Sequence, residues 1–313
     1  MRRLAAVMLM VALAGARAQA TSLESSELTA ARNVRGTFLS RAVGARPAGM
    51  GDAYVAMADD ASAGSWNPAG LGQLTRFGFV ATYDHVSQDT GLRYLAAGMP
   101  AGPGVAGVTL TSMSYGSYDV FDSLGTRTGI KALSDIGASA AYAVENPDWS
   151  GGFGWSGISV EVAREAVGTT LIGAGAGTLI LLGERLSLGA AVQHLGPRQG
   201  GYALPGAARL GAAWMPRDTI RLIGEVADSL ATKTVWAAGG CEAVFGQRLA
   251  FRAGYRVAVN GRAGPGVSGF TTGLGFKISG FGIDYAYQPF GALATSHRVA
   301  LVYGAASGQA AMP

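Results

Sequence analysis

Large apolar side chains alternate with small or polar ones along most of the chain after its first twenty residues. Between residues 249 and 257, for example, Phe251 and Tyr255 share one parity, and Arg252 and Arg256 share the other. Successive side chains of a β-strand point to opposite faces, so such a segment has one apolar face and one wet face. We predict strands at residues 76–84, 92–99, 104–115, 134–144, 157–165, 169–181, 184–194, 206–215, 219–227, 233–244, 248–257, 267–277, 281–289 and 297–304.

A chain made of such strands, and apolar on average, needs lipid or a very large core. Hydrophobic residues make up 49% of it. No apolar run beyond residue 20 reaches the roughly 18 residues that a spanning helix requires. A closed barrel can cross a bilayer with strands because it leaves no backbone edge unpaired. We therefore predict an all-β fold, a closed antiparallel transmembrane β-barrel of about 14 strands in a bacterial outer membrane, with longer connections on one side at 116–133, 145–156, 195–205 and 258–266.

The first twenty residues are typical of a secretory signal peptide. A basic start at Arg2 and Arg3 is followed by the apolar run 4–15 and by small residues that suit cleavage after residue 18 or 20. Cleavage would remove Arg2, Arg3 and Arg17, so the formal net charge would fall from +4 to +1. The basic composition is therefore no indication of nucleic-acid binding.

Charged residues of both signs occupy the positions of the predicted strands whose side chains face the lumen. The inward set comprises Glu161, Arg209, Arg221, Glu225, Glu242, Arg252, Arg256, Lys277, Asp284 and Arg298. Because both signs occur, we interpret it as a lattice of ion pairs lining the lumen, with a selectivity filter as the alternative. Many of the 49 glycines occupy such positions, which leaves room for something inside the barrel.

The segment before the first strand does not alternate and is rich in small residues between positions 44 and 71. Asn67 before Pro68 favours a helix start, and Gly70 or Gly72 should end it after one turn. We expect a compact plug in the lumen. The predicted organisation is a signal peptide (1–20), a hatch (21–75), a transmembrane barrel (76–304) and a C-terminal tail (305–313).

This segment resembles the N-terminal hatch of the FadL-type outer-membrane transporters and, more closely, that of the PorV/PorQ family. The resemblance is carried by Asp59, Asp60, Asn67, Pro68, Ala69 and Gly70, and extends to the segments 188–197, 251–256, 283–290 and 297–301. It implies a fourteen-stranded barrel with the hatch folded inside. It also implies one of two functions, since FadL proteins admit hydrophobic molecules and PorV handles cargo of the type IX secretion system.

The sequence offers no set of residues for catalysis or for a cofactor. His85, His194 and His297 lie far apart, without the paired spacing of a zinc site, and Cys241 is the single cysteine. Three G-x-G-x-x-G matches lack the strand–helix context that gives this motif its meaning. We predict a non-enzymatic protein without metal or cofactor, although a loop-borne Ser-His-Asp set remains an alternative.

Three functions stay open. The first is binding or passage of hydrophobic small molecules, in a pocket lined by Met50, Tyr54, Val55, Met57, Trp66 and Leu71; the same residues would equally suit the packing core of the plug. The second is binding of secreted-protein cargo or a partner subunit by the loops 116–133 and 145–156. The third is a structural barrel embedded in outer-membrane lipid. For Asp59 and Asp60, we weigh a cation site or gate latch against turn chemistry, with one carboxylate paired to an inward arginine of the wall.

Overall fold

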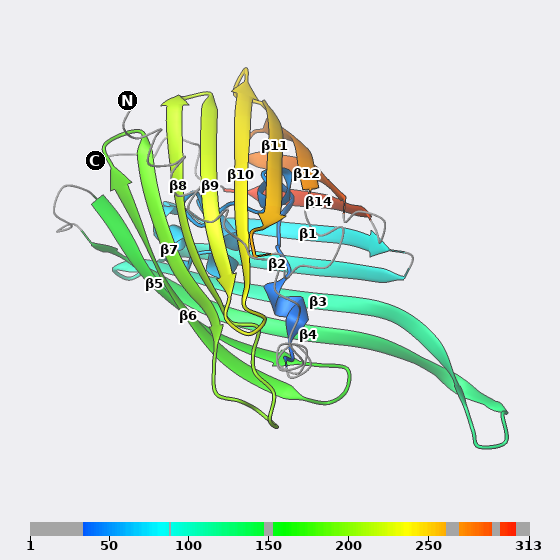
Figure 1. Ribbon diagram of the computed structural model, residues 1–313. Helices are drawn as coiled ribbons and strands as arrows, with labels where there is room; N and C mark the ends of the chain where they lie inside the picture. The colour runs from blue at the N-terminus through cyan, green and yellow to red at the C-terminus, as the bar shows by residue number, and fades with distance from the viewer. Residues whose placement is uncertain (1–33, 88, 147–152, 261–268, 290–294, 305–313) are drawn as a thin grey trace.

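The computed structural model describes residues 34–87, 89–146, 153–260, 269–289 and 295–304. The predicted signal peptide and C-terminal tail lie outside these residues. Within them, fourteen antiparallel strands form one closed barrel, so the predicted fold class is confirmed (Figure 1). The strands are β1 (Gly78–Ser87), β2 (Thr90–Ala101), β3 (Gly104–Phe121), β4 (Arg127–Asn146), β5 (Phe153–Arg164), β6 (Thr170–Leu182), β7 (Leu186–Leu195), β8 (Ala207–Arg217), β9 (Ile220–Ser229), β10 (Thr234–Phe245), β11 (Leu249–Ala258), β12 (Gly269–Ile278), β13 (Phe281–Pro289) and β14 (Thr295–Tyr303).

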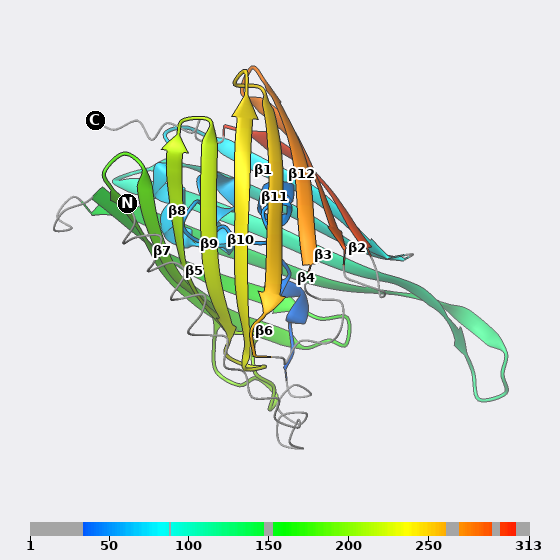
Figure 2. The same cartoon turned by 45° about the horizontal axis from the view of Figure 1, so that its top comes forward.

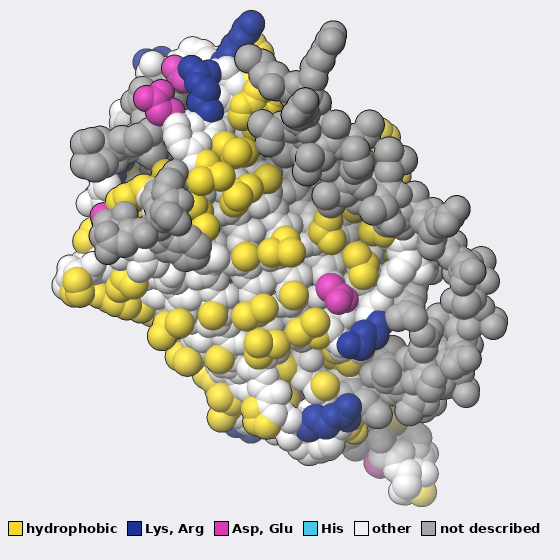
Figure 3. All heavy atoms as spheres, turned by 60° about the vertical axis from the view of Figure 1, so that its left-hand side comes forward, with side chains coloured by type: hydrophobic (Ala, Val, Ile, Leu, Met, Phe, Trp, Pro, Cys, Tyr) yellow, Lys and Arg dark blue, Asp and Glu magenta, His cyan; other side chains and the backbone are white. Residues whose placement is uncertain are grey.

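Each strand pairs with its sequence neighbours, and β1 pairs with β14 to close the ring. The register places Glu242 opposite Arg252 on the inner face, whereas Phe251 is 49% exposed on the outer face. Hydrophobic side chains are spread over most of the wall visible in Figure 3, and few charged side chains interrupt them. The apolar residues of the alternating pattern therefore face outward, and the polar residues face the inside of the barrel.

The connections differ from those predicted at two places. Residues 116–133 are largely strand, because β3 and β4 pair as far as Phe121 and Arg127 and form a ribbon that projects beyond the barrel (Figure 1). Strand β4 ends at Asn146 and β5 begins at Phe153 at the opposite end of the barrel, beside the short turns. The prediction that 116–133 and 145–156 are loops on one side is thus wrong, since strand order places odd and even connections at opposite ends.

Residues 34–77, which we call the luminal segment, run through the interior of the barrel. They contain the short helices η1 (Thr37–Ser40), α3 (Ala45–Gly49), η2 (Ala61–Ser65) and η3 (Pro68–Gln73). Helix α3 contacts β11 to β14, and η3 contacts β3 to β6 on the other side of the lumen. Figures 1 and 2 both show this dark-blue segment surrounded by the strands.

The luminal segment runs from one end of the barrel to the other. Its start bonds to the long-connection end, where the Arg35 amide donates to the Ala203 carbonyl at 2.9 Å and the Gly36 amide donates to Glu165 at 2.7 Å. Its last residue precedes Gly78, which lies beside the final strand residue Tyr303 at the short-turn end. Among the described residues there is no helix long and apolar enough to cross a membrane.

Candidate functional site: the filled lumen

Inward glycines of the wall let the main chain of the luminal segment approach closely. A β-carbon at Gly254 would lie closer than 3.0 Å to the main chain of Gly51, and one at Gly189 would lie equally close to that of Val55. Gly157 contacts the start of η3 in the same way. Real β-carbons do not come this near to main-chain atoms, so glycine is required at these positions.

A buried carboxylate holds one side of the segment. Glu242, on β10, accepts hydrogen bonds from Nε of Arg46 at 3.0 Å, from Arg221 at 2.6 Å and from Arg252 at 2.7 Å. Arg46 also pairs with Asp59 of the segment itself. Arg46 therefore links the segment to the wall.

A second polar cluster lies nearer the long-connection end. Asp52 accepts hydrogen bonds from Arg256 at 2.7 Å and from Gln288 at 2.8 Å. Arg298 pairs with Asp84 at 3.0 Å and approaches Asp52 at 3.9 Å. The cluster joins the segment to β1, β11, β13 and β14.

Other members of the inward set have different partners. Glu225 accepts hydrogen bonds from the main-chain amides of Tyr54 at 2.7 Å and Val55 at 2.9 Å, and it pairs with Arg209 at 2.7 Å. Three further members lie elsewhere: Glu161 pairs with His194 at 2.8 Å, Asp284 pairs with Arg252 at 2.6 Å, and Lys277 lines a cavity described below. The wall charges thus bond both to one another and to the segment.

The two aspartates of the hatch motif differ in role. Asp60 caps η2 by accepting from the Ser62 amide at 2.8 Å, which is the turn chemistry expected. Asp59 pairs with Arg46 of the segment, so the expected pairing to a wall arginine is not what the structure shows. The Tyr54 hydroxyl lies 3.0 Å from an oxygen of each aspartate.

Asn67 makes more contacts than a helix cap requires. Its Oδ1 accepts from the Ala69 amide at 3.2 Å, as expected, and its Nδ2 donates to the carbonyls of Val55 and Thr178 at 2.9 Å each. Because Thr178 belongs to β6, Asn67 also ties the segment to the wall. Pro68 takes the first position of the helix, in agreement with the prediction.

The helix that Asn67 begins is longer than predicted. Helix η3 is a 3-10 helix that continues through Gly70 and Gly72 to Gln73. A β-carbon at Gly70 would clash with the main chain of Ala58, and one at Gly72 would clash with Trp155. These glycines therefore provide close packing and do not end the helix.

The six residues predicted to line an apolar pocket lie in one packed cluster. Met50, Tyr54, Val55, Trp66 and Leu71 are almost completely buried, and Met57 is 8% exposed. The cluster also contains inward residues of β1 to β4, namely Val80, Leu92, Tyr94, Ala96, Val105, Met113, Ala141 and Ala143. None of the six lines either of the cavities described next.

The interior is thus asymmetric, since β1 to β4 contribute much of the apolar packing and β9 to β14 carry most of the ion pairs. A cavity of about 970 Å³ lies on the charged side and is bounded by the turns β8–β9, β10–β11 and β12–β13. A second cavity of about 30 Å³, enough for one or two waters, lies between the segment and strands β3, β4, β5 and β7.

Sequence reasoning missed Arg46 and Asp52. Each is a charged residue in a segment otherwise rich in small residues, and that contrast was the available signal. No group of three or more metal-ligating side chains is assembled within the residues that the structure describes.

No protein-family model matches the sequence, and no curated protein matches it. Solved structures do share its fold. The Pseudomonas putida toluene transporter TodX is 12% identical with a TM-score of 0.56, over 84% of this chain and 97% of that one. The Ralstonia pickettii toluene transporter TbuX is 14% identical with a TM-score of 0.58, over 83% and 96%. A Pseudomonas aeruginosa FadL homologue is 11% identical with a TM-score of 0.54, over 84% and 98%. The chain has the fold of FadL-type outer-membrane channels.

Proposed function

We propose that this protein is a non-enzymatic outer-membrane barrel that binds or passes hydrophobic small molecules. The observation that carries the proposal is the apolar half of the lumen, where inward residues of β1 to β4 pack against the luminal segment. A water-filled pore has a polar interior, whereas the inward side chains of Leu92, Val105 and Met113, packed against the segment, present apolar surface that favours apolar solutes. Two of the proteins that share the fold are toluene transporters, which is consistent with this substrate class.

We further propose that residues 21–75 act as a hatch and that residues 1–20 are removed on export. Ion pairs from the segment reach β1, β10, β11 and β14. The side of the segment that faces β2 to β4 packs mainly through apolar contacts. A hydrophobic solute would therefore pass on that side, where opening a path does not require buried ion pairs to separate.

Uptake of radiolabelled toluene by cells that express the protein tests this proposal. We expect faster uptake than in cells without it. We also expect Met113→Glu to reduce the uptake, because a carboxylate in the apolar half repels an apolar solute. Lys277→Gln, in the charged half, is the matched control and should leave uptake unchanged. Uptake equal to that of cells without the protein would refute the proposal and favour a structural barrel.

Localisation has its own test. The mature protein should fractionate with the outer membrane and show heat-modifiable mobility in detergent gels, because a closed barrel keeps all its strands paired. Recovery as a soluble monomer would contradict the proposal.

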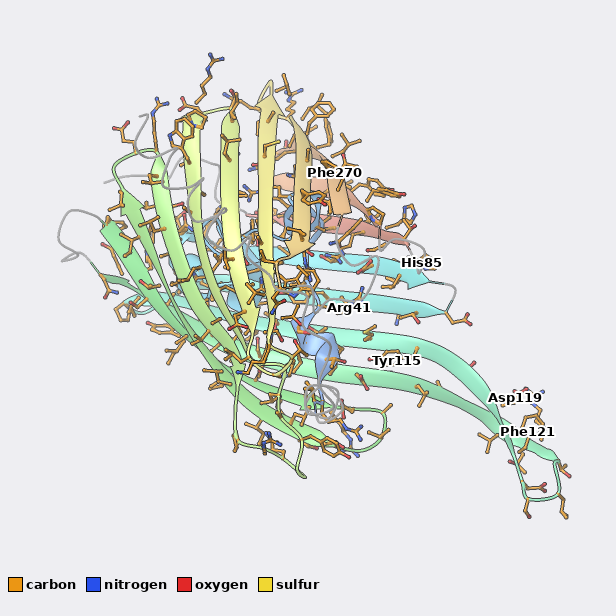
Figure 4. All side chains as sticks on the ribbon, viewed as in Figure 1. Arg41, His85, Tyr115, Asp119, Phe121 and Phe270 are labelled. Carbon is orange, nitrogen blue, oxygen red and sulfur yellow. The ribbon has the colours of Figure 1, made fainter. Side chains whose placement is uncertain are left out.

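A second candidate is a PorV-type component that binds secreted cargo or a partner subunit. The favouring observation is the ribbon of β3 and β4, where Phe121 is 58% and Leu124 is 88% exposed. Figure 4 shows Tyr115, Asp119 and Phe121 along this ribbon and Arg41 inside the barrel. A photo-crosslinker at Leu124 should capture a specific protein in the native host if this candidate is right, whereas one at the wall residue Leu274 should not.

A further inference from the structure

The large cavity, which we call the vestibule, is a part of the lumen that the luminal segment leaves empty. Elsewhere, a β-carbon at an inward glycine such as Gly254 or Gly240 would clash with the segment. At the inward Gly282, the nearest heavy atom would lie 3.7 Å away. Small residues therefore hollow the wall here without accommodating any part of the chain. The resulting 970 Å³ is at the upper end of the volumes of ligand sites.

The carboxylates at the floor of the vestibule are already paired. Oε1 and Oε2 of Glu242 both accept hydrogen bonds from arginines, and Oδ1 of Asp284 accepts from Arg252 at 2.6 Å. Asp60 accepts from Ser62 and from the Tyr54 hydroxyl at 3.0 Å. The charges of Glu242 and Asp284 are therefore neutralised by arginines, whereas Asp60 is bonded to neutral groups and Asp218 also lines the vestibule.

Three cationic side chains of the vestibule, by contrast, have nitrogen atoms that can still donate hydrogen bonds to a ligand. The side chains of Lys277 and Arg248 make no hydrogen bond or ion pair with any residue that the structure describes. They lie close together, since Arg248 is in the turn before β11, Lys277 is on the adjacent strand β12, and the Lys277 amide donates to the Arg248 carbonyl at 2.8 Å. Deeper in, Arg252 is 7% exposed and uses Nε and Nη1 for its ion pairs, which leaves Nη2 without a partner among the described residues. A β-carbon at Gly275 would lie 2.9 Å from this Nη2, so glycine keeps it uncovered.

We propose that the vestibule binds an oxyanion, the phosphate or carboxylate group of a water-soluble compound that enters from the short-turn side. Lys277, Arg248 and Nη2 of Arg252 supply the donors, and charge-assisted hydrogen bonds to such groups are the strong ones. The vestibule opens among the turns and is separated from lipid by the wall, which favours a soluble compound. The inference is independent of hydrocarbon passage, because that proposal uses the apolar half of the lumen.

Isothermal titration of the full-length protein in an uncharged detergent, with citrate and with inorganic phosphate at low ionic strength, tests this inference. We expect saturable binding of at least one probe. Losing one charge-assisted hydrogen bond should weaken that binding about tenfold in Lys277→Gln, and similarly in Arg248→Gln. Lys233→Gln, between β9 and β10 at the other end of the barrel, is the matched control and should bind as the unaltered protein does.

Heat-modifiable mobility shows in each case that the barrel is folded. Arg248 lies in an exposed turn, so its variant keeps the test available if Lys277→Gln fails to fold. Absence of saturable binding for both probes would overturn the inference, as would unchanged affinity in the folded lysine or arginine variant. Toluene uptake should be the same with and without the charge at Lys277, so failure of either proposal is distinguishable from failure of the other.

Discussion

Replacing Gly254 with alanine tests how closely the luminal segment packs against the wall, and it adds only one carbon atom. Gly254 lies on the inner face of β11, and a β-carbon there would come closer than 3.0 Å to the main chain of Met50 and Gly51. Ordinary contact begins at 3.4 Å, so the segment must retreat. In a strand without such a neighbour, the same substitution stabilises by about 0.5–1 kcal/mol. Overpacking costs about 1–3 kcal/mol, so we expect a net loss of up to about 2 kcal/mol.

Gly282→Ala is the matched control, since Gly282 also faces inward and its nearest heavy atom would be 3.7 Å from the added carbon. Urea unfolding of the purified proteins in micelles should show a lower free energy of unfolding for Gly254→Ala, and an equal or higher one for Gly282→Ala. Conductance in planar bilayers should rise in Gly254→Ala alone, because the segment no longer seats fully. Shifts of the same sign and size in both variants would refute the reasoning.

Four further perturbations have defined outcomes. Asn67→Ala should lower the free energy of unfolding by about 2 kcal/mol, because a helix cap and the donor to two main-chain carbonyls are lost together. Glu242→Gln should cost about 3–5 kcal/mol in the same urea assay, because it removes the buried counter-charge that Arg221 shares with Arg46 and Arg252, which keep only Asp59 and Asp284. Phe251→Arg should cost about 2–4 kcal/mol in a refolding titration, because it places a charge on the lipid face. Deleting residues 44–71 should raise single-channel conductance while heat-modifiable mobility is retained, because the wall makes its own ladder of hydrogen bonds.

Controls keep these outcomes specific. Glu184→Gln, in the exposed turn between β6 and β7, should be neutral in the urea assay where Glu242→Gln is not. An Asn67→Ala variant as stable as the unaltered protein would mean that the bonds to Val55 and Thr178 are not formed. An unchanged conductance in the folded deletion variant would mean that the luminal segment does not block the pore.

The alternation of side chains in the sequence determined the barrel. Phe251 and Arg252 were assigned to opposite faces from parity alone, and the structure places the first outside and the second in contact with Glu242. This inference succeeds because strand geometry has a period of two residues and depends on no distant contact. The Asn67–Pro68 helix start was local in the same sense and could be read directly.

The pairing of charges and the filling of the lumen were decided by the tertiary structure alone. Arg46 reaches Glu242 across 196 positions of sequence, and no local pattern indicates that three arginines share this carboxylate. The residues considered for an apolar pocket, such as Trp66 and Leu71, could serve as lining or as core, because only the facing wall decides whether space remains beside them. The vestibule has the same origin. Glycines occur along the whole inner face, and the path of the luminal segment determines which of them are covered and which leave a cavity.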